Sequence, residues 1–280
     1  MQDNHTQILI IGGHDVGKTH FGGQIYGRLQ TRDNFYQITS APENITIFKE
    51  VLDNLNEGKS SGHTNVAANE VLALELKGRD QRETTLSFPD YGGEQVDHIV
   101  SDRRVNKIWT EQLSKSDSWM LFIRPDKIHP VEDIVTRGIP DQEVLKKRKG
   151  STEPLVLSPS AHFVELLQIL NYSRQITARS KKRPRLMVAL SCWDLVADGD
   201  REKLPAEVLR LKLPGLADFL ESVWGIDHTV IGLSSTEKTL SDTKADADFV
   251  KKGPEHFGFF VNPVGETEKD LTLIIGLLSE

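Results

Sequence analysis

The feature that most constrains this chain is an apolar run that ends in a glycine-rich loop. Residues 8–11 are apolar, Gly12 follows them, and Gly17-Lys18-Thr19 comes five residues later, so residues 12–19 match the pattern G-x-x-x-x-G-K-[ST]. Glycines let the backbone curl until successive N–H groups point at phosphate oxygens, and the helix that follows adds unpaired N–H groups and its dipole. The pattern indicates that this loop binds a nucleoside di- or triphosphate.

Two side chains of the loop have predicted roles in the chemistry. We expect Lys18 to reach the β and γ phosphates, and we expect the Thr19 hydroxyl to ligate Mg²⁺. The loop residues predicted to contact the nucleotide are His14, Asp15, Val16, Gly17, Lys18, Thr19 and His20.

Composition narrows the class of protein. A chain of 280 residues can bury a substantial core, and its net charge of −7 argues against nucleic acid as a partner. Cys192 is the only cysteine, so no disulfide can form within the chain. The apolar run at 8–11 is too short for a signal peptide or a membrane span, so a cytoplasmic protein is expected.

The order of apolar runs predicts an α/β fold. We expect an antiparallel hairpin at 71–77 and 84–88, strands at 119–123, 186–190 and 229–233, and helices at 94–113, 160–179, 205–224 (interrupted at Pro214-Gly215) and 270–278. These elements predict a three-layer sandwich of the P-loop NTPase type, with a mainly parallel sheet and one antiparallel hairpin strand. Three segments without clear periodicity, 31–65, 126–158 and 237–258, are interpreted as insertions into a single domain of residues 1–280, and as places for partner surfaces.

A second motif follows the predicted hairpin. Asp90 leaves a buried strand and Gly93 comes three residues later, in Asp90-Tyr91-Gly92-Gly93. A carboxylate at the end of a strand beside a phosphate-binding loop is placed to hold Mg²⁺, usually through water. The N–H of Gly93 would then contact the γ phosphate, which exists only in the triphosphate, so the loop would act as a switch.

The phosphate-binding loop, the hairpin and Asp90-x-x-Gly93 together resemble the TRAFAC class of P-loop GTPases, which includes the Ras-like and Arf-like small GTPases. The Gly92-Gly93 pair is most similar to the Arf and Rag type of switch loop. Trp193-Asp194 and the long insertions resemble the bacterial GTPases grouped as double-GTPase-type conflict-system proteins. The resemblance to the double-GTPase-type proteins implies that the chain acts within a multi-protein defence or signalling assembly.

The resemblance also implies where the base is read. A motif [NT]-K-x-D follows the next-to-last strand in the class, and this chain has Ser191-Cys192-Trp193-Asp194 there. The Asp194 carboxylate can accept hydrogen bonds from guanine N1–H and the exocyclic amine, a donor pair that adenine lacks. Cys192 replaces the lysine whose stem packs on the base, and Ser234 and Ser235 match the short loop whose backbone contacts guanine O6. Asp194 could alternatively cap the end of its strand.

A threonine of the first switch should ligate Mg²⁺ and sense the γ phosphate. Thr64 is the best placed, and Thr39 and Thr46 are alternatives. Asp15 is expected to make a local hydrogen bond within its loop, with a potassium-binding role as the alternative that the class implies.

The catalytic position departs from the small GTPases, which place a glutamine directly after the Asp-x-x-Gly glycine. Glu94 stands there and Gln95 follows, so we expect slow hydrolysis that a partner, or a basic residue such as Arg103 or Arg104, completes. The predicted function is a Mg²⁺-dependent switch that binds GTP and GDP, with Lys18, Thr64, Gly93 and Glu94 as catalytic residues and Thr19, Thr64 and Asp90 at the metal. The alternatives are a nucleotide-binding interaction subunit with little hydrolysis and a P-loop ATPase.

Overall fold

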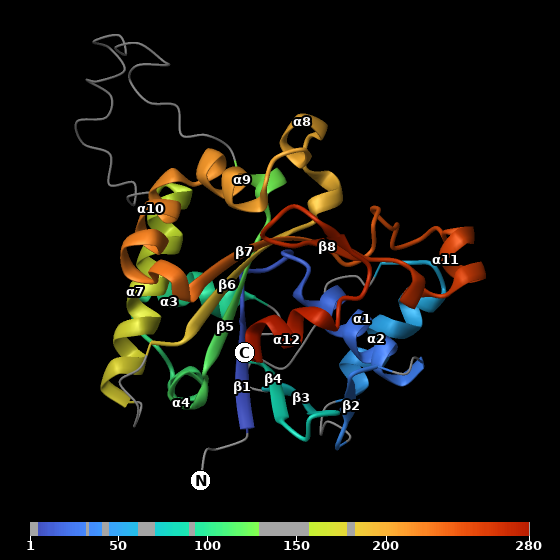
Figure 1. The fold of residues 1–280 in the computed structure, drawn as a ribbon, viewed down its shortest axis with the longest axis horizontal. Coiled ribbons are helices and arrows are strands. Elements are labelled where there is room, and N and C mark those ends of the chain that lie inside the picture. The colour runs from blue at the N-terminus through green and yellow to red at the C-terminus, as the bar shows by residue number, and fades with distance from the viewer. Residues whose placement is uncertain are drawn as a thin grey trace.

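The fold is a nine-stranded sheet between two layers of helices (Figure 1). The structure, a computed structural model, describes residues 5–31, 34–40, 45–60, 71–89, 93–128, 157–177 and 183–279. Within these ranges the strands are β1 (His5–Ile11), β2 (Tyr36–Ile38), β3 (Leu72–Gly78), β4 (Glu83–Phe88), β5 (Ser118–Ile123), β6 (Arg185–Ser191), β7 (His228–Ser234), β8 (Phe259–Val261) and β9 (Thr267–Glu268). Their order in the sheet is β2-β3-β4-β1-β5-β6-β7-β8-β9.

The helices cover both faces of this sheet. They are α1 (Lys18–Thr31), α2 (Ile45–Asn56), α3 (Glu94–Asp102), α4 (Lys107–Lys115), α7 (Pro159–Thr177), α8 (Asp198–Arg201), α9 (Pro205–Lys212), α10 (Pro214–Val223), α11 (Ala247–Lys252) and α12 (Leu273–Ser279). Short 3-10 turns are η1 (Pro125–Lys127), η2 (Trp193–Leu195), η3 (Gly225–Asp227) and η4 (Pro254–His256).

Five central strands, β4, β1, β5, β6 and β7, run parallel. Their carboxyl ends therefore lie along one edge of the sheet. The chain leaves β1 toward strands on one side and later returns to add β5, β6 and β7 on the other, so β1 ends at the point where the winding direction changes. Ligands of open α/β sheets bind at this position.

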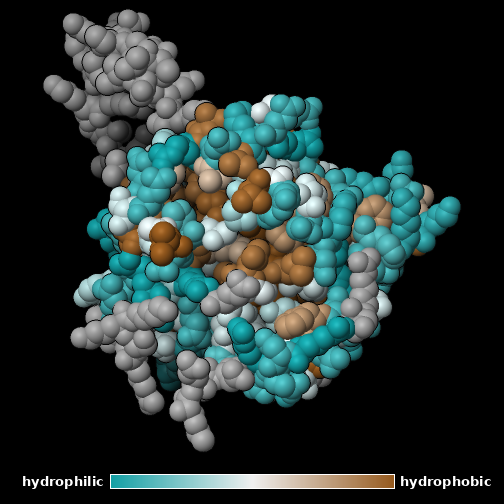
Figure 2. Space-filling view, viewed as in Figure 1, coloured by the Kyte–Doolittle hydropathy of each residue, from teal (hydrophilic) through white to brown (hydrophobic). Residues whose placement is uncertain are grey.

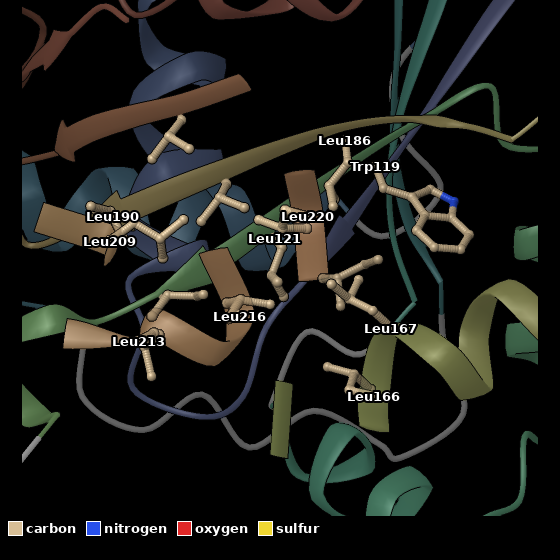
Figure 3. Close-up of a cluster of buried hydrophobic side chains, with 14 of the residues drawn as sticks. Trp119, Leu121, Leu166, Leu167, Leu186, Leu190, Leu209, Leu213, Leu216 and Leu220 are labelled. Carbon is tan, nitrogen blue, oxygen red and sulfur yellow. The ribbon is translucent and has the colours of Figure 1, made fainter. Parts of the chain in front are cut away.

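Side chains of the central strands alternate between the two helical layers. Leu9 and Ile11 of β1 pack in a buried cluster with α3, α4, α7, α9 and α10, and Figure 3 shows part of this cluster, where leucines of α7, α9 and α10 meet Trp119 and Leu121 of β5. Ile8 and Ile10 face the opposite layer, which contains α1, α2 and α12. Continuous apolar runs in these strands are explained by burial on both faces.

The predicted fold class is confirmed. The hairpin of β3 and β4 is antiparallel, with Leu74 opposite Leu86, and β5, β6 and β7 lie where the apolar runs predicted strands. The sheet has further antiparallel strands that the sequence did not predict: β2 pairs with β3 at one edge, and β8 and β9 follow β7 at the other.

Two predictions of local structure need correction. The helix expected over 94–113 is two helices, because Arg103 adopts a left-handed conformation (φ 51°) and the Asn106 side chain caps α4 by accepting from the Trp109 N–H at 2.9 Å. The segments 31–65 and 237–258 are not without regular structure, since they contain β2 and α2, and α11 and η4. Of the segment 126–158, the structure describes only 126–128 and 157–158.

The face seen in Figure 2 is mostly hydrophilic at its rim, with apolar residues gathered near its centre. No helix of the described residues is both long and apolar enough to cross a membrane.

Candidate functional site

The phosphate-binding loop connects β1 to α1 at the carboxyl edge of the sheet. Gly12 is required there, because a Cβ would lie 2.9 Å from Cγ2 of Val16 and 3.0 Å from Cβ of Phe122. Gly17 has φ +84°, in the left-handed region that favours glycine. α1 begins at the next residue, so the N-terminus of a 14-residue helix points toward the loop.

Lys18 lies across the inside of this loop. Its Nζ donates to the carbonyl oxygens of Gly12 at 2.5 Å and Gly13 at 2.6 Å, and its side chain is buried. A buried ammonium group held by two neutral carbonyls can exchange them for phosphate oxygens, which carry charge and form stronger hydrogen bonds. Phosphate binding by Lys18 stays a prediction.

Gly93 brings the second motif against the phosphate-binding loop. It is buried, with φ +85°, and a Cβ there would lie 2.3 Å from the carbonyl C and O of Gly13 and the N of His14. Such a close approach of two backbones is possible only for glycine. The chain therefore positions Gly93 beside the residues that precede Lys18, as the sequence predicted for a γ-phosphate contact.

The two predicted base-reading segments meet at the ends of neighbouring strands. Asp194 follows β6, Ser234 ends β7, and the Ser234 hydroxyl donates to Oδ1 of Asp194 at 2.5 Å. Ser234 also accepts from the Glu237 N–H at 2.9 Å, which fixes its side chain. Oδ2 of Asp194 makes no hydrogen bond with the described residues, so the carboxylate is oriented by one oxygen and can accept through the other.

Cys192 and Trp193 shape the start of this segment. Cys192 has φ 51°, and burial raises the pKa of its thiol to about 11, so the side chain is neutral at pH 7. The Trp193 indole is buried against β7 at Gly232, where a Cβ would lie 2.4 Å from the ring. Trp193 thus anchors the loop that presents Asp194.

The Asp15 carboxylate makes ion pairs with residues outside its own loop. Lys127 of η1 pairs with Oδ2 of Asp15, and Nη1 of Arg124 lies 3.6 Å from the same oxygen. The hydrogen bond from Lys127 lowers the pKa of Asp15 below its ordinary value. The carboxylate predicted to bond locally is thus tied to the segment after β5.

Comparison with known proteins places the chain in a family. The family model described as Double-GTPase 1 matches residues 9–278. The chain belongs to the Double-GTPase 1 family. The resemblance to double-GTPase proteins is therefore confirmed, and this family membership supports nucleotide binding.

Comparisons of this Double-GTPase 1 chain with solved structures and with curated proteins are less informative than the family model. It is similar to the crystal structures of the S. cerevisiae Ski7 GTPase-like domain bound to GTP (12% identity, TM-score 0.48) and bound to GDP and inorganic phosphate (14% identity, TM-score 0.44). Each match covers 82% of this chain and 43% of that one, so the chain spans less than half the length of these structures. No curated protein matches it.

The structure describes Glu94 and Gln95, the residues that follow Gly93 in this Double-GTPase 1 chain. Glu94 begins α3 with an exposed side chain. Gln95 is committed elsewhere, because its Oε1 accepts from Nε1 of Trp109 and Nδ2 of Asn106, both at 3.0 Å. Arg103 pairs with Glu165 of α7 at 2.8 Å. None of these three contacts directs a side chain at the phosphate-binding loop.

Some of the remaining predicted residues lie at the carboxyl edge of the sheet, some lie away from it, and some lie outside the described residues. Val16 and Ser235 lie in the expected loops at the carboxyl edge, and His20 lies in the first turn of α1, where burial lowers its pKa and favours its neutral form. Thr39 continues β2, with β3 and β4 between it and β1, and Thr46 is exposed in the first turn of α2. Thr64 and Asp90 lie outside the described residues.

Of the residues predicted to ligate Mg²⁺, the structure describes only Thr19. The Thr19 hydroxyl stands at the start of α1, next to Lys18, and makes no hydrogen bond with the described residues. Among those residues no group of three His, Cys, Asp or Glu side chains could hold a metal ion. The Mg²⁺ site formed by Thr19, Asp90 and Thr64 therefore stays a prediction.

Arg124 and Lys127 were not predicted as site residues. Their signal in the sequence was their place directly after the buried strand at 119–123, since the carboxyl ends of parallel strands share an edge.

Proposed function

We propose that this chain is a Mg²⁺-dependent guanine-nucleotide switch that hydrolyses GTP slowly to GDP and phosphate. The observation that carries the proposal is the row of groups along one sheet edge. Lys18 and Gly93 both lie against Gly13 after β1, and Asp194 and Ser234 meet after β6 and β7, two and three strands away. A nucleotide lying along this edge has its phosphates at one end and its base at the other.

Each group has a chemical task in the proposed switch. Lys18 and the N–H groups of the loop bind the β and γ phosphates, and Gly93 contacts the γ phosphate only in the triphosphate. Asp194 accepts from guanine N1–H and the exocyclic amine, with its carboxylate oriented by Ser234. Thr19, Asp90 and Thr64 would hold Mg²⁺, which supplies positive charge to the phosphates when bound.

Hydrolysis in this proposal is an attack by water on the γ phosphorus, in line with the bond to the β–γ bridging oxygen. That bond breaks, GDP keeps the electron pair, and phosphate leaves with the oxygen of the water. Lys18 and the loop N–H groups stabilise the charge that develops on the oxygens. We propose that residues 1–280 form one such domain, and that the insertions and switch segments contact a protein partner that completes catalysis.

A second candidate, a nucleotide-binding subunit with little hydrolysis, is favoured by the environment of residues 94 and 95. Glu94 would bring a negative charge toward the γ phosphate, and Gln95 already binds Trp109 and Asn106. Single-turnover phosphate release from bound GTP separates the two candidates. Release over minutes to hours supports the slow switch, and no release above the rate of free GTP supports the second candidate.

Binding itself is tested with a fluorescent GTP analogue. Lys18→Ala should abolish measurable binding, whereas Lys107→Ala, at an exposed position on α4, should leave the affinity within about twofold. Equal binding by wild type and Lys18→Ala, or binding by neither, would overturn the proposed function.

A further inference from the structure

Arg124 stands between the two halves of the proposed site. It follows β5, and β5 lies between β1, which leads into the phosphate-binding loop, and β6, which leads to Asp194. The register pairs Ile11 with Leu121 and Ile123 with Leu190, so the three strands end at similar heights. A side chain at 124 is therefore close to both loops.

The guanidinium is held firmly in this place. Its Nε lies 3.0 Å from Oδ1 and 3.2 Å from Oδ2 of Asp126, and its Nη2 lies 3.1 Å from Oδ2. Nη1 donates to the backbone carbonyl of Asp15 at 3.2 Å. Only 19% of the side chain is exposed. Asp126 fixes the direction of the guanidinium, and the Asp15 carbonyl accepts from Nη1.

The charge of Arg124 also acts on Cys192. Arg124 lowers the pKa of that thiol, against the larger effect of burial, so the two side chains are electrostatic neighbours. The thiol itself is neutral at pH 7, and position 192 brings no positive charge to the space between the phosphate-binding loop and Asp194. Arg124, which is always protonated, brings a cation from β5 to the phosphate-binding loop, beside Lys127, which pairs with the Asp15 carboxylate.

We propose that Arg124 is a nucleotide-positioning residue: it supplies, from β5, the positive charge that couples the phosphate-binding loop to the base-reading segment, where position 192 holds a neutral thiol. It acts through Asp15, by fixing the backbone of the loop. This inference rests on the proposed binding of GTP. It assigns to an arginine outside both motifs the place that a lysine at 192 would otherwise occupy.

A charge transplant tests this role. Arg124→Ala should weaken binding of fluorescent GTP and GDP by about tenfold or more, because a charge-assisted hydrogen bond to the loop is lost. Adding Cys192→Lys to Arg124→Ala returns a cation to the same space and should restore most of the affinity. Arg82→Ala is the matched control, because Arg82 also pairs with an aspartate two residues away, Asp80 at 3.0 Å, in the turn between β3 and β4 at the opposite end of these strands.

The outcomes are distinct. Wild-type affinity in Arg124→Ala, or a loss that Cys192→Lys does not restore, would show that the charge has no positioning role. If a thermal melt shows that Arg124→Ala does not fold, the single variant Cys192→Lys decides. Arg124 should repel the second cation, so Cys192→Lys should not tighten GTP binding. Tighter GTP binding by Cys192→Lys would overturn the proposal. Failure of the wild type to bind GTP overturns the proposed function as well, whereas GTP binding that survives Arg124→Ala overturns only the role of Arg124.

Discussion

Replacing Gly93 with alanine tests the contact on which the switch depends. The new Cβ would lie 2.3 Å from backbone atoms of Gly13 and His14. These atoms belong to the phosphate-binding loop and cannot rotate away as the end of a side chain could. Relief of the overlap requires one of the two loops to move by about 1 Å, since ordinary carbon contacts begin near 3.5 Å.

The cost has two parts. An alanine at φ +85° costs about 1–2 kcal/mol relative to glycine, and overpacking against a fixed neighbour costs about 1–3 kcal/mol. Gly93→Ala should therefore lower the free energy of unfolding by about 2–5 kcal/mol. Gly225→Ala separates the parts, because Gly225 is also left-handed (φ +54°) but a Cβ there meets nothing within 4 Å, so about 1–2 kcal/mol is expected.

Urea denaturation followed by the fluorescence of the four tryptophans measures both losses. Binding assays add a functional readout: Gly93→Ala should weaken GTP more than GDP, because only GTP has the phosphate that Gly93 is proposed to contact, and Gly225→Ala should weaken neither. Equal losses of stability in the two variants, with an unchanged ratio of GTP to GDP affinity, would refute the close approach of Gly93 to the loop.

Three further predictions concern the neighbouring residues. Cys192, the only thiol, should react with iodoacetamide about 100-fold more slowly in the folded chain than in urea at pH 8, because burial raises its pKa from 9.0 to about 11. The folded state keeps the proton, so the free energy of unfolding should fall as pH rises from about 9 to about 11. Equal reaction rates in the folded and unfolded chain would contradict this burial. Gly232→Ala should lower the free energy of unfolding by about 1–3 kcal/mol, because the new Cβ displaces the Trp193 indole. Gly199→Ala is the control and should lower it by under about 1 kcal/mol, because a Cβ there meets nothing within 4 Å. Thermal melts compare the two variants, and equal losses would contradict the packing of Trp193. Removing Mg²⁺ with EDTA should weaken GTP binding at least about tenfold in the wild type and much less in Thr19→Ala, measured by fluorescence titration; an equal loss in both would contradict the role of Thr19.

The parts of the site that are local in sequence were predictable. The glycines and Lys18 follow one apolar strand within a dozen residues, and loop geometry favours glycine at Gly12, by close contacts, and at Gly17, by its positive φ. Asp194 and Ser234 were each predicted to follow a strand, but the contact between them was not predicted, because it depends on β6 and β7 being neighbours in the sheet.

The pairing of Asp15 with Arg124 and Lys127 was not predictable from a pattern. More than 100 residues separate the partners, and they meet because β5 pairs with β1, which only the assembled sheet reveals. The strands β8 and β9 are three and two residues long, too short to show a period of two.

Helix α2 was missed for a different reason. Phe48, Val51 and Leu55 are buried at helical spacing, so the pattern was present in the sequence. The interpretation of 31–65 as an insertion without clear periodicity overlooked this helix. The break between α3 and α4 was likewise visible as Asn106, a favourable N-cap residue three positions before Trp109.

The measurement that tests the central claim most directly is nucleotide competition against fluorescent GTP, made on the wild type and on Asp194→Asn. Wild type should prefer GTP over ATP and XTP by at least about 100-fold, because the carboxylate accepts from two guanine donors. The asparagine amide donates to the C2 carbonyl of xanthine, so the variant should lose GTP affinity and gain XTP affinity. ATP binding as tight as GTP in the wild type, or unchanged GTP affinity in Asp194→Asn, would contradict the assignment of a guanine-nucleotide site.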